Sequence, residues 1–191
     1  MNTSGKLPKL IAILGMSGSG KGTVVEYLTK KFGWPSVYFG GMVYEEVERR
    51  GLDIVKDETS VREDMRRQEG PSVLAKRVAK KSREYLDNGA EAVVADGLYS
   101  WSEDKYLRQE FGDDIITIAA VVPKWLRYQR VTERVDSRRR YTVNDIMQRD
   151  ITEIENIEKG GPIAFADYYV MNDGDLDNVY AQLDQIIERY K

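Results

Sequence analysis

Glycines, small hydroxyl residues and one lysine gather directly after the first apolar run of the chain, Leu10–Leu14. In chain order they are Gly15, Ser17, Gly18, Ser19, Gly20, Lys21, Gly22 and Thr23. Glycines let several backbone N–H groups converge on one anion, and a helix that begins at the lysine aims its positive end at the same point. The lysine adds a charge that can follow a phosphoryl group during transfer. Apolar strand, glycine-rich turn, lysine and helix therefore predict a phosphate-binding loop.

One position of this loop departs from the commonest pattern. A serine or threonine usually follows the lysine and holds Mg²⁺, but here Gly22 follows and the hydroxyl comes one residue later, on Thr23. The order glycine, lysine, glycine, threonine is typical of nucleoside monophosphate kinases. It favours small phosphotransferases over switch-type GTPases and makes Thr23 a candidate magnesium residue.

A carboxylate stands at the end of another apolar run, in the order Val93-Val94-Ala95-Asp96-Gly97. At the edge of a sheet, Asp96 can orient the water shell of Mg²⁺ beside bound phosphates. The alternative is an aspartate that only begins a turn or caps the next helix.

Arginines are concentrated in one segment of a slightly acidic chain: Arg127, Arg130, Arg134, Arg138, Arg139 and Arg140. The first three are spaced for one helix face, and the others lie in a stretch without apolar anchors, which predicts a small lid at about 134–145. Guanidinium groups stabilise the charge that phosphoryl transfer spreads over oxygens, and a closed lid excludes water. A solvated charged face and a nucleic-acid patch are the alternatives. Arg149, after the lid, can either reach the phosphates or form a structural ion pair.

Composition narrows the chemistry further. The chain has 191 residues, 41% of them hydrophobic, and a net charge of −3, so we expect one compact domain over residues 1–191 without bulk attraction for nucleic acid or membrane. It contains neither cysteine nor histidine, which excludes disulfides, thiolate chemistry and imidazole bases. The apolar stretch 115–122 is too short to span a bilayer, and we expect a cytoplasmic protein. Composition leaves the oligomeric state open.

The elements that must position these residues alternate between strand and helix. Strands are expected at 10–14, 37–39, 92–95, 115–122 and 168–171, with helices at 21–32, 42–50, 71–88, from 123, from 142 and at 176–187. Short apolar strands separated by helices predict a five-stranded parallel sheet with helices on both faces, a three-layer αβα sandwich. Ligands of such sheets bind beyond the carboxyl ends of the strands, where the loop at Gly15 and the turn at Asp96 both lie.

Finer expectations concern faces and boundaries. Tyr85 should be buried on the helix over 71–88, Ser102 should cap a short helix, and Ile151 and Ile154 should face inward. Gly160-Gly161-Pro162 should break the preceding helix. The region at about 40–90 is a natural acceptor-binding helical insertion, with Arg66 and Arg77 as its candidate phosphate ligands.

At this point the chain resembles the adenylate kinase-like nucleotide kinases over nearly its whole length. The loop from Gly15 to Thr23, the turn Phe39-Gly40-Gly41-Met42, Asp96-Gly97, Arg130 with Arg134, and the lid carry the resemblance. Three further segments look like the archaeal-type predicted nucleotide kinases related to adenylate and dephospho-coenzyme A kinases: 45–52, 69–77 and 166–174.

The resemblance implies a five-stranded core, a lid, ATP as phosphoryl donor and Mg²⁺ as cofactor. It places Arg130 against the adenine or its phosphates, and Arg134 with one of Arg138, Arg139 and Arg140 around the transferred group. Asn172 and Gly174 correspond to residues that wrap the adenine. Gly40 and Gly41 belong to the acceptor side.

The departures fall on that acceptor side. Adenylate kinases carry an Asp after the turn glycine and an Arg three residues further, where this chain has Gly41 and Tyr44. Tyr99 stands where the relatives have a second acceptor-phosphate arginine. Either Arg66 and Arg77 hold the acceptor phosphate instead, or the acceptor is less charged at this point, or both tyrosines only pack in the core.

The sequence therefore predicts a magnesium-dependent kinase that moves the γ-phosphoryl group of ATP to a small nucleotide-like acceptor. The alternative within enzymes is a dephospho-coenzyme A kinase. From another class, the alternative is a nucleotide-dependent regulatory protein with slow ATPase activity.

Overall fold

The computed structural model describes residues 5–134 and 141–190. Their strands form one parallel sheet, as the alternation of elements predicted, and the strand order is β2-β3-β1-β4-β5. The strands are β1 (Leu10–Leu14), β2 (Ser36–Tyr38), β3 (Val93–Leu98), β4 (Ile115–Val121) and β5 (Tyr168–Met171). Because β1 pairs with β3 on one side and β4 on the other, the loop after β1 emerges at the middle of the sheet.

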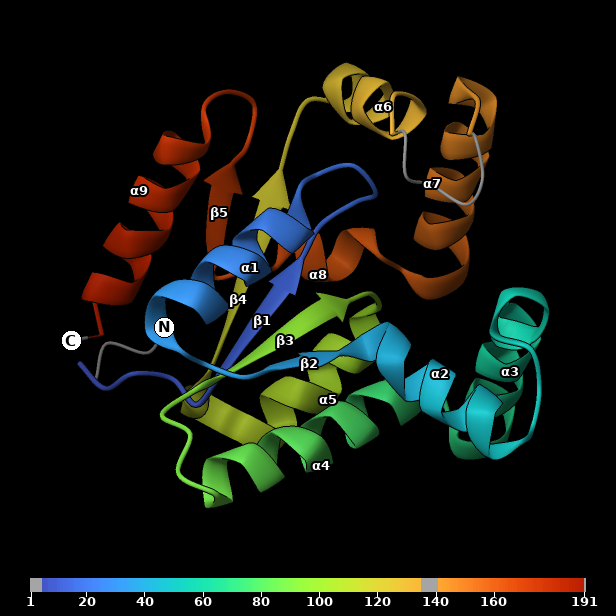
Figure 1. The fold of residues 1–191 in the computed structure, drawn as a ribbon, viewed down its shortest axis with the longest axis horizontal. Helices are drawn as coiled ribbons and strands as arrows, with labels where there is room; N and C mark the ends of the chain where they lie inside the picture. Colours follow the sequence, from blue (N-terminus) through green and yellow to red (C-terminus); the bar gives the residue numbers. More distant parts are fainter. Residues whose placement is uncertain (1–4, 135–140, 191) are drawn as a thin grey trace.

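Helices cover both faces of the sheet (Figure 1). The alternation of side chains along β1 sorts them: Ile11 and Ile13 pack with α1 (Lys21–Phe32) and α9 (Leu176–Glu188). Leu10, Ala12 and Leu14 face the opposite layer. Its helices are α2 (Phe39–Arg49), α3 (Ile54–Glu69), α4 (Val73–Asp87) and α5 (Trp101–Phe111). The result is the predicted three-layer αβα arrangement.

A third, smaller group of elements lies between β4 and β5 in the chain. It contains α6 (Lys124–Thr132), α7 (Val143–Ile157) and the short α8 (Gly160–Ala164). Tyr128, Val131 and Ile146 form an apolar cluster of their own here, apart from the two clusters on the faces of the sheet. In Figure 1, α6 and α7 lie beyond the end of the sheet where β1 and β4 point.

Several expected boundaries and faces need correction. The strand through Asp96 and Gly97 continues to Leu98, with a register irregularity against β1 and a φ of +93° at Gly97. Phe39 begins a helix instead of ending β2. Ser100, not Ser102, caps α5, because its hydroxyl accepts the Glu103 N–H while the Glu103 carboxylate reaches back to the cap.

Three apolar side chains expected in the interior are exposed. Tyr85, Ile151 and Ile154 are 38%, 39% and 49% exposed, so only Ile146 anchors α7 as expected. The glycine pair and proline at 160–162 lie inside α8, and α7 ends instead at Ile157, where the capping residue Glu158 adopts a left-handed conformation. That sharp turn returns the chain towards the sheet and buries the residue after it, Lys159.

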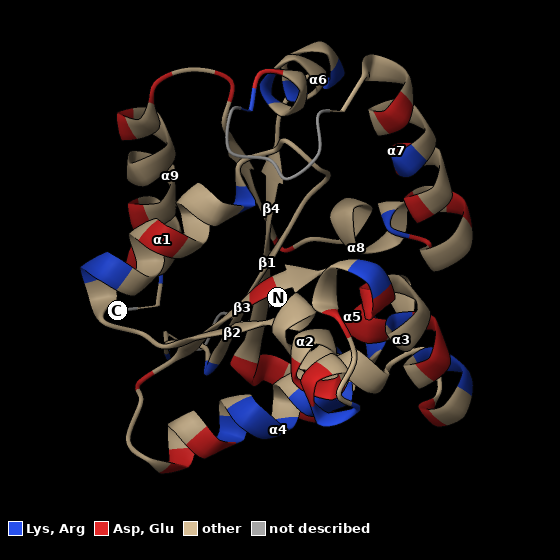
Figure 2. Ribbon diagram, turned by 45° about the vertical axis from the view of Figure 1, so that its right-hand side comes forward, with Lys and Arg blue, Asp and Glu red and all other residues tan. Residues whose placement is uncertain are grey.

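Charges on the surface are mixed. Figure 2 shows Lys and Arg interspersed with Asp and Glu on α2, α3 and α4. No helix of the described chain is both long and apolar enough to cross a bilayer.

Candidate functional site

The glycine-rich loop between β1 and α1 is closely supported by its surroundings. Gly15, Gly18 and Gly20 all have positive φ angles, which L side chains rarely adopt. A Cβ at Gly18 would lie 2.6 Å from the Arg127 carbonyl oxygen, and one at Gly20 would lie 1.9 Å from the Asn172 amide nitrogen. These glycines are therefore required by packing against the protein as well as by approach of a phosphate.

Two side chains from distant parts of the chain hold the loop from behind. The Asn172 amide donates to the Ser19 carbonyl over 3.0 Å, and the Arg127 guanidinium donates to the Ser17 carbonyl over 2.9 Å. Arg127 also pairs with Asp150 of α7 at 2.7 Å, and all three side chains are buried. The sequence placed Arg127 with Arg130 and Arg134 on one helix face, but α6 ends at Thr132, so Arg134 lies beyond the helix.

Lys21 lies folded into the mouth of the loop. Its ammonium donates to the Gly15 carbonyl at 2.8 Å and more weakly to that of Met16 at 3.4 Å. Burial, reinforced by the positive charge of Lys159, lowers the pKa of Lys21 to about 8. These carbonyl contacts hold the lysine where an incoming phosphate could take their place.

Asp96 stands on β3, directly beside Tyr38 of β2 and Ile13 of β1 in the sheet register. Burial raises the pKa of its carboxyl, while the nearby charge of Lys21 acts in the opposite direction. No cluster of three or more potential metal-binding carboxylates occurs in residues 5–134 and 141–190. One carboxylate completed by phosphates and water is nevertheless a donor set that suits Mg²⁺.

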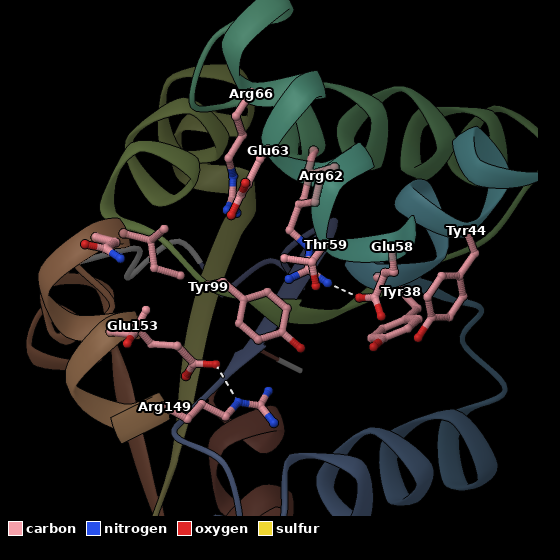
Figure 3. A pocket seen from close by; sticks show the side chains of 15 residues that line it. Tyr38, Tyr44, Glu58, Thr59, Arg62, Glu63, Arg66, Tyr99, Arg149 and Glu153 are labelled. Atoms are coloured by element: carbon pink, nitrogen blue, oxygen red, sulfur yellow. Dashed lines mark hydrogen bonds and ion pairs between the residues drawn. The ribbon is translucent and has the colours of Figure 1, made fainter. Parts of the chain in front are cut away.

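A cavity of about 390 Å³ opens between two walls, beside the end of β3. One wall comes from β2, α2 and α3, and the other from α7 (Figure 3). Its lining side chains include Tyr38, Tyr44, Glu58, Arg62, Glu63, Arg66, Tyr99, Arg149 and Glu153. Tyr99 points into the middle of this view, between the two walls.

The structure brings together part of the predicted acceptor set. Gly40, Tyr44, Arg66 and Tyr99 all line the cavity. Gly41 does not line it. Arg77 faces elsewhere, because it pairs with Glu46 at 3.1 Å and with Glu69 at 2.7 Å. Arg49, Arg50 and Arg77 together hold the pKa of the buried Glu46 carboxyl well below its usual range, so Arg77 has a structural role in α4.

Other predicted residues lie outside the cavity. Thr23 is on the first turn of α1, Gly174 is exposed in the turn before α9, and Arg130 is partly exposed on α6. Asn172 is buried against the loop. Arg138, Arg139 and Arg140 lie outside the described residues, so the greater part of the predicted lid does too.

Lys159 and Glu153 were missed by reasoning from sequence. Lys159 is only 1% exposed, pairs with Glu153, and its ammonium lies 4.7 Å from the centre of the Tyr99 ring. Burial lowers the pKa of Lys159, and the charge of Glu153 opposes that shift. Glu153 also accepts from Arg149 at 3.0 Å. The only sequence signal was the expected helix break at Gly160-Gly161-Pro162, next to Lys159, although the chain turns at Glu158 instead.

Comparison with known proteins agrees with this fold. Residues 14–158 match the family profile described as an AAA domain. The chain is 33% identical over 183 residues to a UPF0200 protein of Thermococcus kodakarensis, with 94% of this chain and 96% of that protein covered. A shikimate kinase from Bacteroides thetaiotaomicron has a similar fold, with a TM-score of 0.60, 14% identity and coverage of 93% and 95%.

A gluconokinase from Sinorhizobium meliloti is also similar in fold, with a TM-score of 0.56, 16% identity and coverage of 96% of this chain and 95% of that one. At such low identities these two structures establish the kinase-like fold alone. The 33% sequence identity to the Thermococcus protein is stronger evidence of relationship than these two fold similarities. The chain belongs to the UPF0200 family of archaeal P-loop proteins.

Proposed function

We propose that this protein is an ATP-dependent phosphotransferase that moves the γ-phosphoryl group of ATP to a small, nucleotide-like acceptor in the cavity beside Tyr99. The observation that carries the proposal is the glycine-rich loop with the Lys21 ammonium held in its mouth. Burial and the charge of Lys159 lower the pKa of Lys21, and Glu153 and Arg149, whose charges also act on the ammonium, line the cavity. A donor phosphate in the loop and an acceptor in the cavity would therefore meet at one lysine.

The catalytic work assigned to the chain is positioning and charge stabilisation. The loop N–H groups and the start of α1 would hold the donor phosphates, and Lys21 would follow the transferred group. Mg²⁺ would be held by the phosphates and by water oriented by Asp96, with Thr23 as the nearby hydroxyl, and it would neutralise developing charge. Arg130, Arg134 and the arginines at 138–140 remain predicted donor-side residues.

Measurement of ADP release tests the proposal. The wild-type protein is assayed with MgATP alone and with each of a panel of acceptors: the common nucleoside monophosphates, nucleosides and dephospho-coenzyme A. We expect one acceptor to stimulate ADP release well above the basal rate. Slow hydrolysis that no acceptor changes would instead support a nucleotide-dependent regulatory protein, and selective stimulation by dephospho-coenzyme A would identify the alternative kinase.

A matched pair of lysine variants on α1 connects that activity to the loop. Lys21→Ala should lower turnover by orders of magnitude, because it removes the charge that follows the phosphoryl group. Lys30→Ala, which alters an exposed lysine paired only with Glu26, should leave turnover unchanged. Circular dichroism checks that both variants fold. Turnover of Lys21→Ala within twofold of wild type would defeat the proposal.

A further inference from the structure

The arginines that line the candidate acceptor cavity already face carboxylates. Arg62 pairs with Glu58, Arg149 with Glu153 at 3.0 Å, and Arg66 with Glu103 at 3.2 Å. Figure 3 shows the first two of these pairs on opposite walls. If a phosphate bound one of these arginines in place of its carboxylate, that carboxylate would lose its partner.

That exchange is unfavourable for two physical reasons. Glu103 is fully buried and also accepts from the Tyr99 and Ser100 N–H groups, so Arg66 cannot swing away without leaving a buried charge. Glu58 and Glu153 line the cavity themselves, as does Glu63, and all three would face the phosphate as like charges. The cavity is therefore poorly suited to a second phosphate group.

Three tyrosine rings, by contrast, line the cavity, and two of them pack against glycines. A Cβ at Gly40 would lie 2.4 Å from the Tyr38 ring, and a Cβ at Gly97 would lie 3.0 Å from the Tyr99 ring. Each tyrosine ring thus lies against the backbone of a glycine two residues away, where a larger residue would displace it. Tyr44 meets Tyr38 edge to face, with ring centres 6.1 Å apart.

The hydroxyls of Tyr38 and Tyr99 stay protonated. Burial raises the pKa of Tyr99 well above its ordinary value, and partial burial together with neighbouring Tyr44 and Asp96 raises that of Tyr38. A neutral phenol both donates and accepts one hydrogen bond, which matches the hydroxyl groups of a sugar or polyol better than the oxygens of a phosphate.

We propose that the acceptor in this cavity is an unphosphorylated, hydroxyl-rich compound, such as a nucleoside or another sugar-containing molecule, and that its hydroxyl oxygen receives the phosphoryl group. This inference rests on the proposed phosphotransferase function. In the step, a bond forms between the acceptor oxygen and the γ-phosphorus, and the bond from that phosphorus to the β–γ bridging oxygen breaks. ADP leaves with the electron pair, the hydroxyl proton ends on water, and the product is a phosphate monoester.

Calorimetry on the protein loaded with Mg²⁺ and a non-hydrolysable ATP analogue tests the inference, because the analogue occupies the loop. Titration with methyl phosphate should give no saturable heat for wild type. Glu58→Gln, which releases Arg62 into the cavity, should instead give saturable heat with methyl phosphate, given the strength of charge-assisted contacts. Glu26→Gln, which breaks an exposed pair on α1, is the matched control and should resemble wild type.

Two results have different consequences. Saturable binding of methyl phosphate by wild type, lost in Arg66→Ala, would show a phosphate subsite in the cavity and overturn the inference while leaving the kinase proposal intact. Failure of the ATP analogue to bind at all would remove the proposed function itself. Among substrates, adenosine or ribose should outperform AMP or ribose 5-phosphate, and ³¹P spectra should show an ester; an anhydride formed only from the phosphorylated partners would contradict the inference.

Discussion

Lys21 is a residue of the candidate site whose surroundings strongly shift its pKa. It is held by two loop carbonyls, and its burial favours the neutral amine more than in an exposed lysine. With a folded-state pKa lowered from 10.5 to about 8, the folded protein binds fewer protons than the unfolded chain between these values. Lys21 therefore opposes folding below pH 8, and this destabilisation fades as the pH rises towards 10.5.

Binding of ATP should have the opposite pH dependence to that stability term. A triphosphate favours the charged ammonium, so above pH 8 the free protein must take up a proton to bind it. We expect the affinity for a non-hydrolysable ATP analogue to fall as the pH rises above 8, by at most about tenfold per unit. Calorimetry in buffers of different ionisation enthalpy measures the proton uptake directly.

Lys21→Arg supplies the control, because a guanidinium stays charged throughout this range. Its analogue affinity should be nearly independent of pH between 8 and 10. An equal slope in both proteins would show that another group titrates, and would contradict the role given to Lys21.

Substitution of Asp96 tests whether its carboxylate helps to hold Mg²⁺. Asp96→Asn keeps the size of the side chain and removes the charge that would orient the water shell of Mg²⁺. We expect the Mg²⁺ concentration for half-maximal turnover to rise several-fold, with a smaller change in ATP affinity. An unchanged magnesium titration would leave Asp96 with only its structural place beside Tyr38.

At the scale of elements, the corner between α7 and α8 connects the two sides of the site. The left-handed turn at Glu158 places Lys159 in the interior, between Glu153 and the ring of Tyr99. Lys159→Met should lower the free energy of unfolding by about 3 kcal/mol, because removal of one partner leaves Glu153 charged and mostly buried. The value should lie at the low end for such pairs, since Arg149 still contacts Glu153.

Denaturant unfolding compares this variant with Lys30→Met, which removes a lysine from an exposed pair on α1. Exposed pairs contribute little, so the control should unfold at nearly the wild-type denaturant concentration. A loss in Lys159→Met no larger than in the control would mean that water solvates Glu153 as well as Lys159 does.

Comparison of the predicted and observed elements shows which structural features the sequence predicts correctly. The strands Leu10–Leu14 and Tyr168–Met171 and the helix Lys21–Phe32 have the predicted limits, because short apolar runs and flanking glycines record local conformation. The exposed Ile151 and Ile154 were misplaced, because helical spacing shows that a face is apolar and not what covers it. In α7 only the first turn meets the cluster with Tyr128.

The candidate site likewise has one part that the sequence predicts well and one part that it does not. The glycine-rich loop is one continuous segment whose chemistry can be read directly. The cavity draws residues from 38 to 157, and whether Arg66 or Arg77 reaches it depends on which carboxylate each one meets. Such ion pairs join residues that are far apart in the chain, so the sequence alone does not reveal them. The sequence offered Arg77 and Arg66 equally, and only Arg66 lines the cavity.

At the scale of the whole molecule, two large apolar clusters bind helices to the faces of the sheet, whereas α6 and α7 share a small cluster of their own. Segments with few buried apolar contacts open more readily than the core. We expect amide hydrogen exchange in α7 to be faster than in β1 and β4. The buried chain of contacts from Ser17 through Arg127 to Asp150 then connects α7 to the donor loop.

This chain of contacts predicts that nucleotide binding at the loop also stabilises α7. A bound ATP analogue should slow exchange both in the loop and in α7, because fixing Ser17 also fixes Arg127 and its partner Asp150. Asp150→Asn, which removes the charge of the pair but leaves the Ser17 contact, should keep the protection of the loop and lose most of the protection of α7. Glu155→Gln, at an exposed position on the same helix, should behave as wild type. Equal protection of α7 in all three proteins would mean that the nucleotide reaches α7 by another route, with the arginines of α6 as the next candidates.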